Sequence, residues 1–513
     1  MLWTRGSPGN YTAWSDMGLA DWAWDKVEPY FRRLENLTGP LSKSQSAVRG
    51  RGGPINLRKP PYTFKWLKYI GEAAGEIGVP TLDDCNDPDA PLCSYSTFET
   101  AIDEHGERVS ALSAYLNRTI ARERSERLSI CTGTVASRLE IADDDENERT
   151  VTGVHIRSSS GPTMANHYLV KARREVILTC GAMTTPQLLL LSGIGPGGEK
   201  SSGSRLDIPL VKELPAVGAD FSDHYSVPVM LELPKKETLH FLETAMWGLW
   251  CILLWVFTGK GPVGCSTAPA AIFLHTDSVD EKTMKVTSND LHGHQVPNVE
   301  IMFIPVNSLE RAVPGRTLFS IYSTILQPQA KGHLEVTSTD PLVNPKITHP
   351  MFGHADDLKA ARVAVRFSMR LAAEFQTLYP LPAPFAFAPG NELRSLREWE
   401  ESGGVKLKHV EKLATEPTQA NKTWKDVTDD EIDDYMRRVG HTALHFSTTC
   451  PMGTSENNGV VDQKLKVFGF KNLRIADASV FPKSISAHTM APVLMVAERC
   501  ADFVKTTWKG SED

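Results

Sequence analysis

Apolar residues recur at helical spacing in three parts of the chain. Residues 22–34, 63–77 and 356–374 each place their apolar side chains on one face of a helix, and the third segment is long and amphipathic. A fourth helix is predicted after Thr428, because Thr428 and Glu431 have the spacing of a capping box. Gly440 follows and is expected to end this helix.

Residues 128–180 have strand character. LSICTGTVASRLEI and VTGVHIRS read as two strands, and the acidic run 143–146 between them is expected to be a solvated hairpin loop. The nearly continuous apolar run REVILT at 174–179 predicts a strand in a sheet that is covered on both faces. A glycine turn and the helix TPQLLLLSG follow, and this order is typical of an α/β fold.

The most apolar segment is AMWGLWCILLWVF, residues 245–257. It has 13 residues and no charge, whereas a membrane-spanning helix needs about 20. We expect a helix that is buried or lines a cleft, with contact to a membrane surface as the alternative. Trp247, Trp250, Trp255 and Phe257 are expected to pack in a core or to line an apolar cleft.

Composition excludes several classes of protein. The 513 residues suggest about three domains or two large ones. With 55 basic and 62 acidic residues the net charge is −7, and no basic stripe points to nucleic acid. Eight cysteines without a CxxC pair make a disulfide framework or structural zinc improbable, and we expect no metal. The sequence shows no signal peptide, but sequons at Asn10, Asn36, Asn117 and Asn421 leave secretion of a longer parent open.

Two GxGxxG matches fail as phosphate-binding loops. They begin at Gly193 and Gly259, and each follows a predicted helix and contains a proline. A dinucleotide-binding loop must instead follow a strand and open a helix.

Candidate chemistry gathers near the C-terminus. HTALHFSTTCPMG, residues 441–453, has strand-like composition, which would place His441 and His445 on one face. Metal binding by this pair is disfavoured because the preceding helix ends at Gly440. Residues 473–476 predict a short buried strand that ends in a turn at Asp477, where α/β proteins bind ligands. His488 stands just before another helix, whose positive end faces the same site.

Several segments together resemble the glucose–methanol–choline (GMC) family of flavoprotein oxidoreductases. GAMTTPQLLLLSGIG resembles the family's second signature, and VGADFSDH resembles V-G-x-N-x-x-D-H with Asp220 in place of Asn. HFSTTCPMG resembles H-x-x-G-T-C-x-M-G with Thr448 in place of Gly, and RGSPGNYTAW resembles R-G-x-x-x-D-Y-x-x-W with Asn10 in place of Asp. DASVFP and SAHTMAP resemble the closing motifs.

The resemblance implies an α/β fold in which an FAD-binding Rossmann-like domain is interleaved with an α+β substrate domain built on an antiparallel sheet. We expect an FAD-binding half at 1–227, a substrate-domain segment at 228–325 and a C-terminal half at 326–505. The implied reaction is oxidation of a CH–OH group of a small alcohol, with His445 as base and His488 holding the substrate oxygen. The implied FAD contacts are Val135, Asp477, Ala478, Thr489 and Met490.

The resemblance also exposes a gap. Family members begin with a strand–GxGxxG–helix unit before the RGSP segment, whereas here Met1 lies directly before it. We expect an incomplete gene prediction, or else a fragment, and the chain as written should bind FAD poorly. A non-redox lyase or cyclase on this fold, and an inactive remnant, are the alternatives. The alcohol, the electron acceptor and the oligomeric state are not determined by the sequence.

Overall fold

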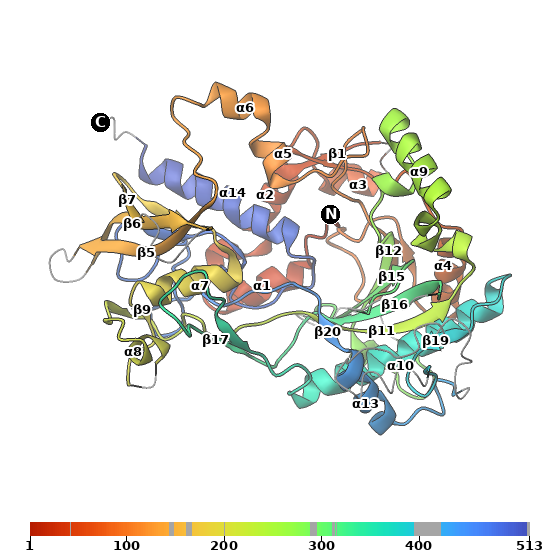
Figure 1. Cartoon of the computed structure of the whole chain (residues 1–513). Helices are drawn as coiled ribbons and strands as arrows, with labels where there is room; N and C mark the ends of the chain where they lie inside the picture. Colours follow the sequence, from red (N-terminus) through yellow and green to blue (C-terminus); the bar gives the residue numbers. More distant parts are fainter. Residues whose placement is uncertain are drawn as a thin grey trace.

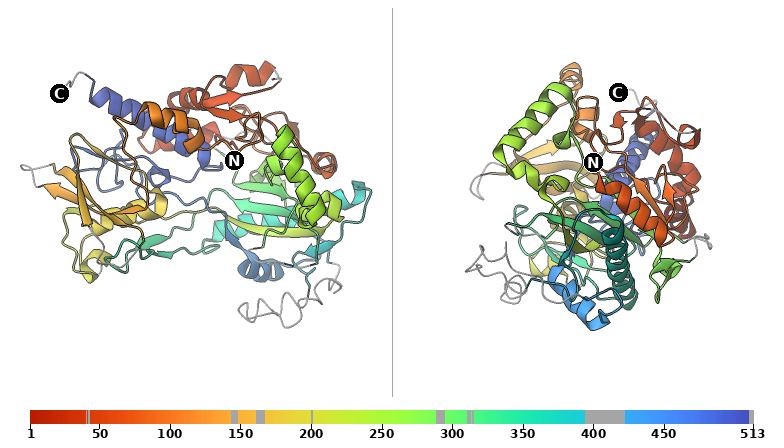
Figure 2. Two further views of the ribbon diagram at one scale, coloured as in Figure 1. Left: turned by 45° about the horizontal axis from the view of Figure 1, so that its top comes forward. Right: turned by 90° about the vertical axis from the view of Figure 1, so that its right-hand side faces the viewer.

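The computed structural model describes residues 1–39, 41, 43–142, 148–160, 167–199, 201–287, 295–309, 313, 315–393 and 422–509. Two large hydrophobic cores organise them, and Figure 1 shows the helices and strands that surround these cores. One core lies against a large antiparallel sheet. The other combines the first 60 residues with the last 60, and Figure 2 shows these red and blue segments side by side. The expected acidic loop at 143–146 and the sequon at Asn421 lie outside the described residues.

The large sheet has eight strands, in the order β19-β11-β16-β15-β12-β4-β3, with β20 also pairing with β11. Only β3 and β4 pair in parallel, so the predicted antiparallel sheet is confirmed. Its strands are β3 (Thr81–Leu82), β4 (Ser94–Thr97), β11 (Tyr225–Glu232), β12 (Ala270–Leu274), β15 (Val299–Ile304), β16 (Leu318–Ile325), β19 (Phe385–Phe387) and β20 (His441–Thr442).

Alternation along these strands gives the sheet two different faces. On β15, Val299, Ile301 and Phe303 join the core under α10 (Ala355–Leu378) and α4 (Trp66–Glu76). Glu300 and Met302 point to the opposite face. That face carries a smaller apolar cluster, whose members are Leu2, Phe98, Ala268, Ala271, Phe273, Met302, Tyr322 and Leu326. The sheet therefore offers Glu300 to a site on the face away from α10.

The second core surrounds the parallel pair β8 (Val176–Leu178) and β21 (Leu473–Ile475). The predicted strand–turn–helix unit is present, because α7 (Gly181–Leu191) follows β8 directly. The prediction that β8 is covered on both faces is wrong, since Ile177 is 41% exposed. Among the described residues, β21 is the only strand that pairs with β8, so the other edge of β8 pairs with no strand there.

The remaining elements connect or cover these two cores. Three strands, β5 (Thr134–Ala142), β6 (Thr150–Ser158) and β7 (His167–Lys171), form an antiparallel sheet. The other strands are β1 (Glu35–Leu37), β2 (Ile55–Leu57), β9 (Ile194–Gly195), β10 (Lys212–Glu213), β13 (Val279–Asp280), β14 (Lys285–Val286), β17 (His333–Glu335) and β18 (Lys346–Thr348). The other α-helices are α1 (Pro8–Asp16), α2 (Trp24–Leu34), α3 (Lys43–Val48), α5 (Ala111–Tyr115), α6 (Arg118–Glu123), α8 (Ser202–Arg205), α9 (Ala245–Thr258), α13 (Asp429–Val439) and α14 (Met490–Thr507). The 3₁₀ turns are η1 (Ala20–Trp22), η2 (Lys235–Glu237), η3 (Leu239–Glu243), η4 (Pro262–Gly264), η5 (Thr276–Ser278) and η6 (Ala478–Val480).

The segment after α13 differs from its prediction. The capping box of Thr428 with Glu431 is present, but the continuous strand over 441–449 is not. Only His441–Thr442 is a strand, and Leu444 and Thr448 have positive φ angles of 61° and 69°. Gly440 ends α13 with an extended backbone, and its small size matters because a Cβ atom there would lie 2.5 Å from the carbonyl oxygen of Met436.

Helix α9 was expected to be buried or to line a cleft, and it is not buried. Trp247 and Trp250 are 58% and 57% exposed, and Phe257 is 80% exposed. Within α9 the rest of the protein buries only Cys251, and Trp255 is partly buried. Within the described residues, no helix combines the length and apolar character needed to cross a membrane.

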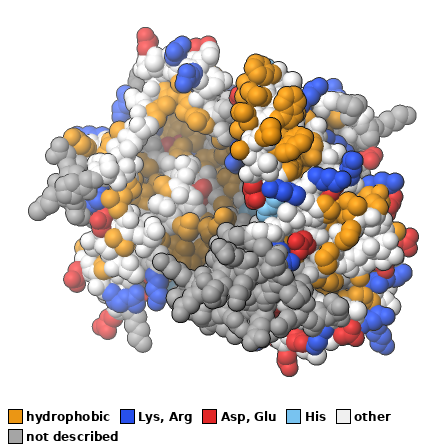
Figure 3. Space-filling model, turned by 45° about the vertical axis from the view of Figure 1, so that its right-hand side comes forward, with side chains coloured by type: hydrophobic (Ala, Val, Ile, Leu, Met, Phe, Trp, Pro, Cys, Tyr) orange, Lys and Arg blue, Asp and Glu red, His pale blue; other side chains and the backbone are white. Residues whose placement is uncertain are grey.

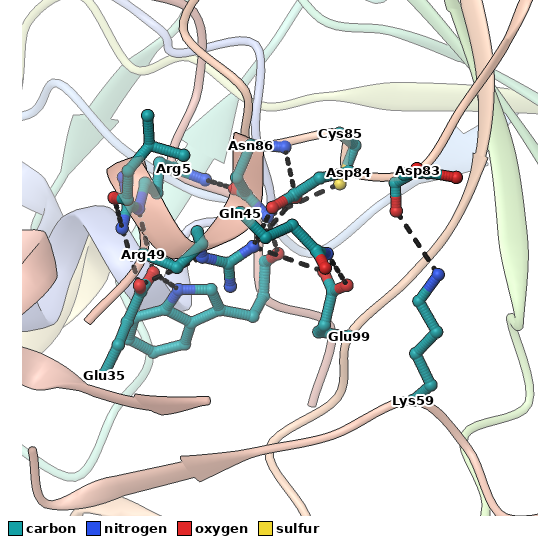
Figure 4. Close-up of polar contacts among 12 residues, drawn as sticks. Arg5, Glu35, Gln45, Arg49, Lys59, Asp83, Asp84, Cys85, Asn86 and Glu99 are labelled. Atoms are coloured by element: carbon teal, nitrogen blue, oxygen red, sulfur yellow. Dashed lines mark hydrogen bonds and ion pairs between the residues drawn. The ribbon is translucent and has the colours of Figure 1, made fainter. Parts of the chain in front are cut away.

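A buried charge network ties the N-terminal segment to the second core (Figure 4). The Glu35 carboxylate accepts hydrogen bonds from Arg5 at 2.6 and 2.8 Å, from Arg49 at 3.0 Å and from the Trp3 indole at 2.6 Å. Arg49 also bonds Asp84 at 2.8 Å and Glu99 at 3.4 Å. Asp84, Cys85 and Glu99 lie close enough to hold an ion, but both carboxylates already form ion pairs with the guanidinium of Arg49.

We expect Glu35→Ala to lower the free energy of unfolding by about 3–5 kcal/mol, because it leaves the buried guanidinium of Arg5 without its counter-charge. Burial alone would raise the pKa of Glu35, but Arg5 and Arg49 outweigh it and hold the pKa at about 2. The stabilisation is therefore present above the ordinary pKa of 4.5 and is lost as the pH falls toward 2. Urea unfolding at several pH values measures both effects. Glu72→Ala, which removes an exposed ion pair with Lys68, is the control and should change stability by about 0.5 kcal/mol or less. An equal effect of the two variants would contradict the role of the network.

Candidate active site

Three histidines and a glutamate form one hydrogen-bonded row. Nδ1 of His224 lies 3.0 Å from Nδ1 of His445, and Nε2 of His445 lies 3.3 Å from Nδ1 of His488. Nε2 of His488 lies 3.1 Å from Oε1 of Glu300. Adjacent rings are nearly perpendicular, with centroids 5.1 Å and 4.9 Å apart. The structure thus brings the two predicted catalytic histidines together and adds a partner at each end.

Four separate parts of the chain hold this row in place. Asp223 accepts a hydrogen bond from the backbone N–H of His445 at 2.9 Å and another from the Thr442 hydroxyl. The backbone N–H of His488 donates to Oγ1 of Thr4 at 2.8 Å. Glu300 is fixed by the register of β15 between β12 and β16. His441, by contrast, bonds the Tyr322 hydroxyl at 2.8 Å and does not join the row.

Two unusual residues in the family-like motifs lie where the backbone turns sharply. Asp220 and Thr448 have positive φ angles of 53° and 69°. Asn is well tolerated in this conformation and Gly has no steric penalty there, whereas a β-branched residue is strained. The Thr448 hydroxyl donates to the Asp220 carbonyl oxygen, and this bond joins the two turns. Two of the three positions that depart from the motifs, Asp220 and Thr448, are therefore in direct contact.

Burial and neighbouring charge lower the pKa values of two of the imidazoles. The pKa of His445 lies well below its usual value, first because of burial and then because a charge on His488 repels a second one. The pKa of His224 falls to about 3, again from burial and then from His488. Burial also raises the pKa of Asp223 to about 6. His445 and His224 are therefore neutral near pH 7.

Apolar side chains enclose the far end of the row. Phe98 meets the His488 ring edge-to-face with centroids 6.0 Å apart, and Phe273 packs against Phe98. Glu300 is fully buried, and its Oε2 has no hydrogen-bond partner in the described part of the chain. Because water is excluded here, the carboxylate depends on His488 for compensation.

The residues predicted to contact FAD fall into three groups. Thr489 and Met490 directly follow His488 and open the 18-residue helix α14, whose N-cap Thr489 makes no side-chain capping bond. Such a helix end attracts negative charge, so this region would stabilise the negative charge that a flavin ring gains when it accepts a hydride. Thr489 and Met490 are partly exposed, as a contact surface requires.

The second group is Asp477 with Ala478, and the third is Val135. The Asp477 carboxylate accepts three internal bonds, from the Gly181 and Ser479 backbones at 2.9 and 2.8 Å and from the Thr185 hydroxyl at 2.6 Å. Asp477 thus joins the end of β21 to the start of α7. The Ala478 carbonyl accepts from the N–H of Thr448 at 3.2 Å, which places this turn beside the His445 segment. Val135 lies near the start of β5, and α7 packs against both β5 and the Ala478 turn.

Sequence reasoning missed His224 and Glu300 as members of the site. His224 closes the motif VGADFSDH, so its signal was present in the sequence. Glu300 is the one charged residue in the apolar strand NVEIMFI, and a lone carboxylate in a buried strand is a signal for a buried partner.

Comparisons with known proteins agree with this geometry. The GMC oxidoreductase profile matches residues 1–226 with its N-terminal part and 328–497 with its C-terminal part. Dehydrogenase str4 of Strobilurus tenacellus is 28% identical over 98% of this chain and 79% of its own length. The mitochondrial choline dehydrogenase of Homo sapiens is 26% identical over 98% of this chain and 73% of its own length.

Solved structures show the same fold. A formate oxidase superposes with a TM-score of 0.79 at 23% identity, covering 99% of this chain and 82% of its own. A fungal aryl-alcohol oxidase superposes with a TM-score of 0.74 at 20% identity, covering 99% and 84%. The histidine row, the fold and both profile matches agree, and the chain belongs to the GMC oxidoreductase family, whose cofactor is FAD.

Proposed function

We propose that the protein oxidises the CH–OH group of a small alcohol with FAD, and that His445 takes the hydroxyl proton. The observation that carries the proposal is the contact of 3.3 Å between Nε2 of His445 and Nδ1 of His488 beside the open end of α14. A substrate hydroxyl near these two nitrogens can give its proton to one and keep a hydrogen bond to the other.

The surrounding groups favour one distribution of protons over the row. An ionised Glu300 accepts a hydrogen bond from Nε2–H of His488, and a fully buried carboxylate favours a positive charge on that ring. His488 then carries protons on both nitrogens, and its Nδ1–H points toward His445. This assignment agrees with the lowered pKa of His445 and of His224, since a charged His488 is among the causes in both cases.

The same distribution leaves His445 with a free lone pair on Nε2. Its Nδ1–H donates to Nδ1 of His224, which fixes the ring orientation. The neutral His445 can then accept the hydroxyl proton at Nε2, while Nδ1–H of His488 donates to the substrate oxygen and stabilises the negative charge that develops there.

Thr489 and Met490 at the start of α14 would hold the flavin ring, and Ala478, Asp477 and Val135 would lie along the rest of the cofactor. Bound FAD supplies the acceptor for the hydride that leaves the alcohol carbon. The direct test uses a flavin-loaded version of the protein extended upstream, without oxygen, mixed with choline or an aryl alcohol, the substrate types named for its relatives. Loss of the oxidised-flavin absorbance supports oxidation, and product formation without that loss supports a lyase instead.

We expect His445→Ala to lower the rate of flavin reduction by about 10²- to 10⁴-fold, because it removes the proton acceptor. Stopped-flow absorbance measures the rate, and thermal unfolding checks the fold. His333→Ala removes a half-exposed histidine outside the row and should leave the rate unchanged. A His445→Ala variant that turns over normally would refute the role.

The two substitutions of His488 should differ. In His488→Asn an amide can still donate to the substrate oxygen, so part of the activity should remain. His488→Ala removes the donor and should cost about tenfold or more beyond the Asn variant. The measurement is kcat/KM for the same alcohol. If both variants retained the same activity, His488 would not contact the substrate directly.

Glu300 acts through His488 and is a positioning residue. Glu300→Gln keeps the side-chain shape but removes the charge, so we expect kcat to fall by about 10- to 10³-fold. Glu300→Asp keeps the charge and should retain more activity than Glu300→Gln, because its carboxylate can still pair with His488. Glu140→Gln alters a similar contact, 2.6 Å from His155 and far from the row in sequence, and is the control. Equal activity of Glu300→Asp and Glu300→Gln would indicate that the charge of Glu300 does not act on His488.

A further inference from the structure

Helix α9 presents a continuous apolar surface to solvent (Figure 3). Six of its side chains are more than half exposed, namely Met246, Trp247, Leu249, Trp250, Val256 and Phe257. At 3.6 residues per turn these positions cover about half of the helix circumference. The three aromatic residues alone expose roughly 300–500 Å², at about 150–250 Å² for each full side chain. That area equals the largest apolar patch of a typical monomer.

The opposite side of α9 is fastened to the protein. Cys251 is buried, and the Trp255 indole donates to the Gly106 carbonyl oxygen at 3.0 Å. Gly259 ends the helix in the left-handed conformation, and a Cβ atom there would lie 2.7 Å from the backbone of His105. These contacts fix the rotation of the helix about its axis. The apolar half is therefore held outward.

Basic residues stand at both ends of this surface. Lys235 and Lys236 precede the helix, Lys260 follows it, and all three are exposed. The helix itself contains no charged residue. Exposed acids also lie near both ends: Glu243 precedes the helix and is 2.8 Å from His240, and Glu104 adjoins His105, which contacts Gly259. Figure 3 shows Lys and Arg side chains along the margin of the apolar surface.

We propose that α9 binds the surface of a membrane that contains anionic lipid. A helix of 14 residues is about 21 Å long, too short to span a bilayer, but it can lie in the interface with its apolar half among the acyl chains. Trp247 and Trp250 suit this depth, because tryptophan concentrates at membrane interfaces. Lys235, Lys236 and Lys260 would then meet lipid head groups.

The shape and chemistry of the surface favour lipid over a second copy of the chain. Figures 1 and 2 show α9 on the rim of the molecule, so it projects from the surface. A protein–protein interface of ordinary composition carries about one hydrogen bond per 100–200 Å² and a polar rim. The six exposed side chains offer only two indole N–H groups. Acyl chains need no matched hydrogen bonds, whereas a protein partner does.

Sedimentation with phosphatidylcholine vesicles that contain about 30 mol% phosphatidylserine tests the proposal. We expect the full chain to sediment with these vesicles, and Trp250→Glu/Phe257→Glu to reduce the bound fraction at least about tenfold. The control Leu210→Glu/Val170→Glu changes two equally exposed apolar residues elsewhere and should bind as the unaltered protein does. Lys235→Gln/Lys236→Gln/Lys260→Gln should lower binding to the level seen with pure phosphatidylcholine.

A second readout locates the contact. Vesicles with brominated acyl chains should quench part of the tryptophan fluorescence, and Trp247→Phe/Trp250→Phe should bind but lose that quenching. Sedimentation velocity without lipid measures self-association. Protein that stays in the supernatant, or equal loss of binding in the two double Glu variants, would overturn the proposal. A dimer that only Trp250→Glu/Phe257→Glu dissociates, with no vesicle binding, would identify a second copy as the occupant instead.

Discussion

Glu300 is fully buried on β15, and its carboxylate bonds one side chain, the ring of His488 at 3.1 Å. A buried charge without compensation is costly, so this contact constrains the protonation of the whole row. In the proposed distribution of protons, His488 carries the compensating charge, and that charge disfavours a second one on His445 or His224. Burial is the larger cause that keeps His445 neutral, and a charge on the neighbouring His488 adds to it. The division of roles between two similar histidines follows from their unequal neighbours.

The row can exist only because distant segments converge on one face of the sheet. Glu300 reaches that face by strand alternation, since Val299 and Ile301 face the core on the other side. The Asp223 carboxylate accepts a hydrogen bond from the backbone N–H of His445, and the Thr4 hydroxyl accepts one from the backbone N–H of His488. The N-terminal segment that carries Thr4 is in turn fixed by the Glu35 network. The Glu35 network, which holds the N-terminal segment in place, thus helps to set the position of His488.

Local sequence signals predicted the parts of the fold that depend on local physics. The capping box at Thr428, the long helix α10 and the β8–α7 unit follow from periodicity, capping and glycine position. The segment after Gly440 did not follow, because hydrogen bonds to Asp223 and Asp220 override its strand propensity. Helix α9 was misjudged for a related reason. Apolar composition indicates that exposure of a surface to water is unfavourable, but it does not show whether other parts of the protein bury that surface.

The site was predicted in the same uneven way. Motif resemblance pointed to His445 and His488, because both stand in short sequence motifs that resemble those of the family. Glu300 was missed because its role arises from contact across 188 positions of the chain. Asp477 was expected beside the cofactor, and its carboxylate is engaged in three internal bonds that shape the turn. The contacts of Glu300 and Asp477 join residues far apart in the chain, and they were visible only in three dimensions.

The distribution of protons over the row is the central claim, and neutron diffraction from a deuterated crystal near pH 7 reads it directly. The account predicts deuterons on both nitrogens of His488, a deuteron on Nδ1 of His445 with none on its Nε2, and none on the carboxylate of Glu300. A neutral His488 beside a doubly protonated His445, or a protonated Glu300, would contradict it.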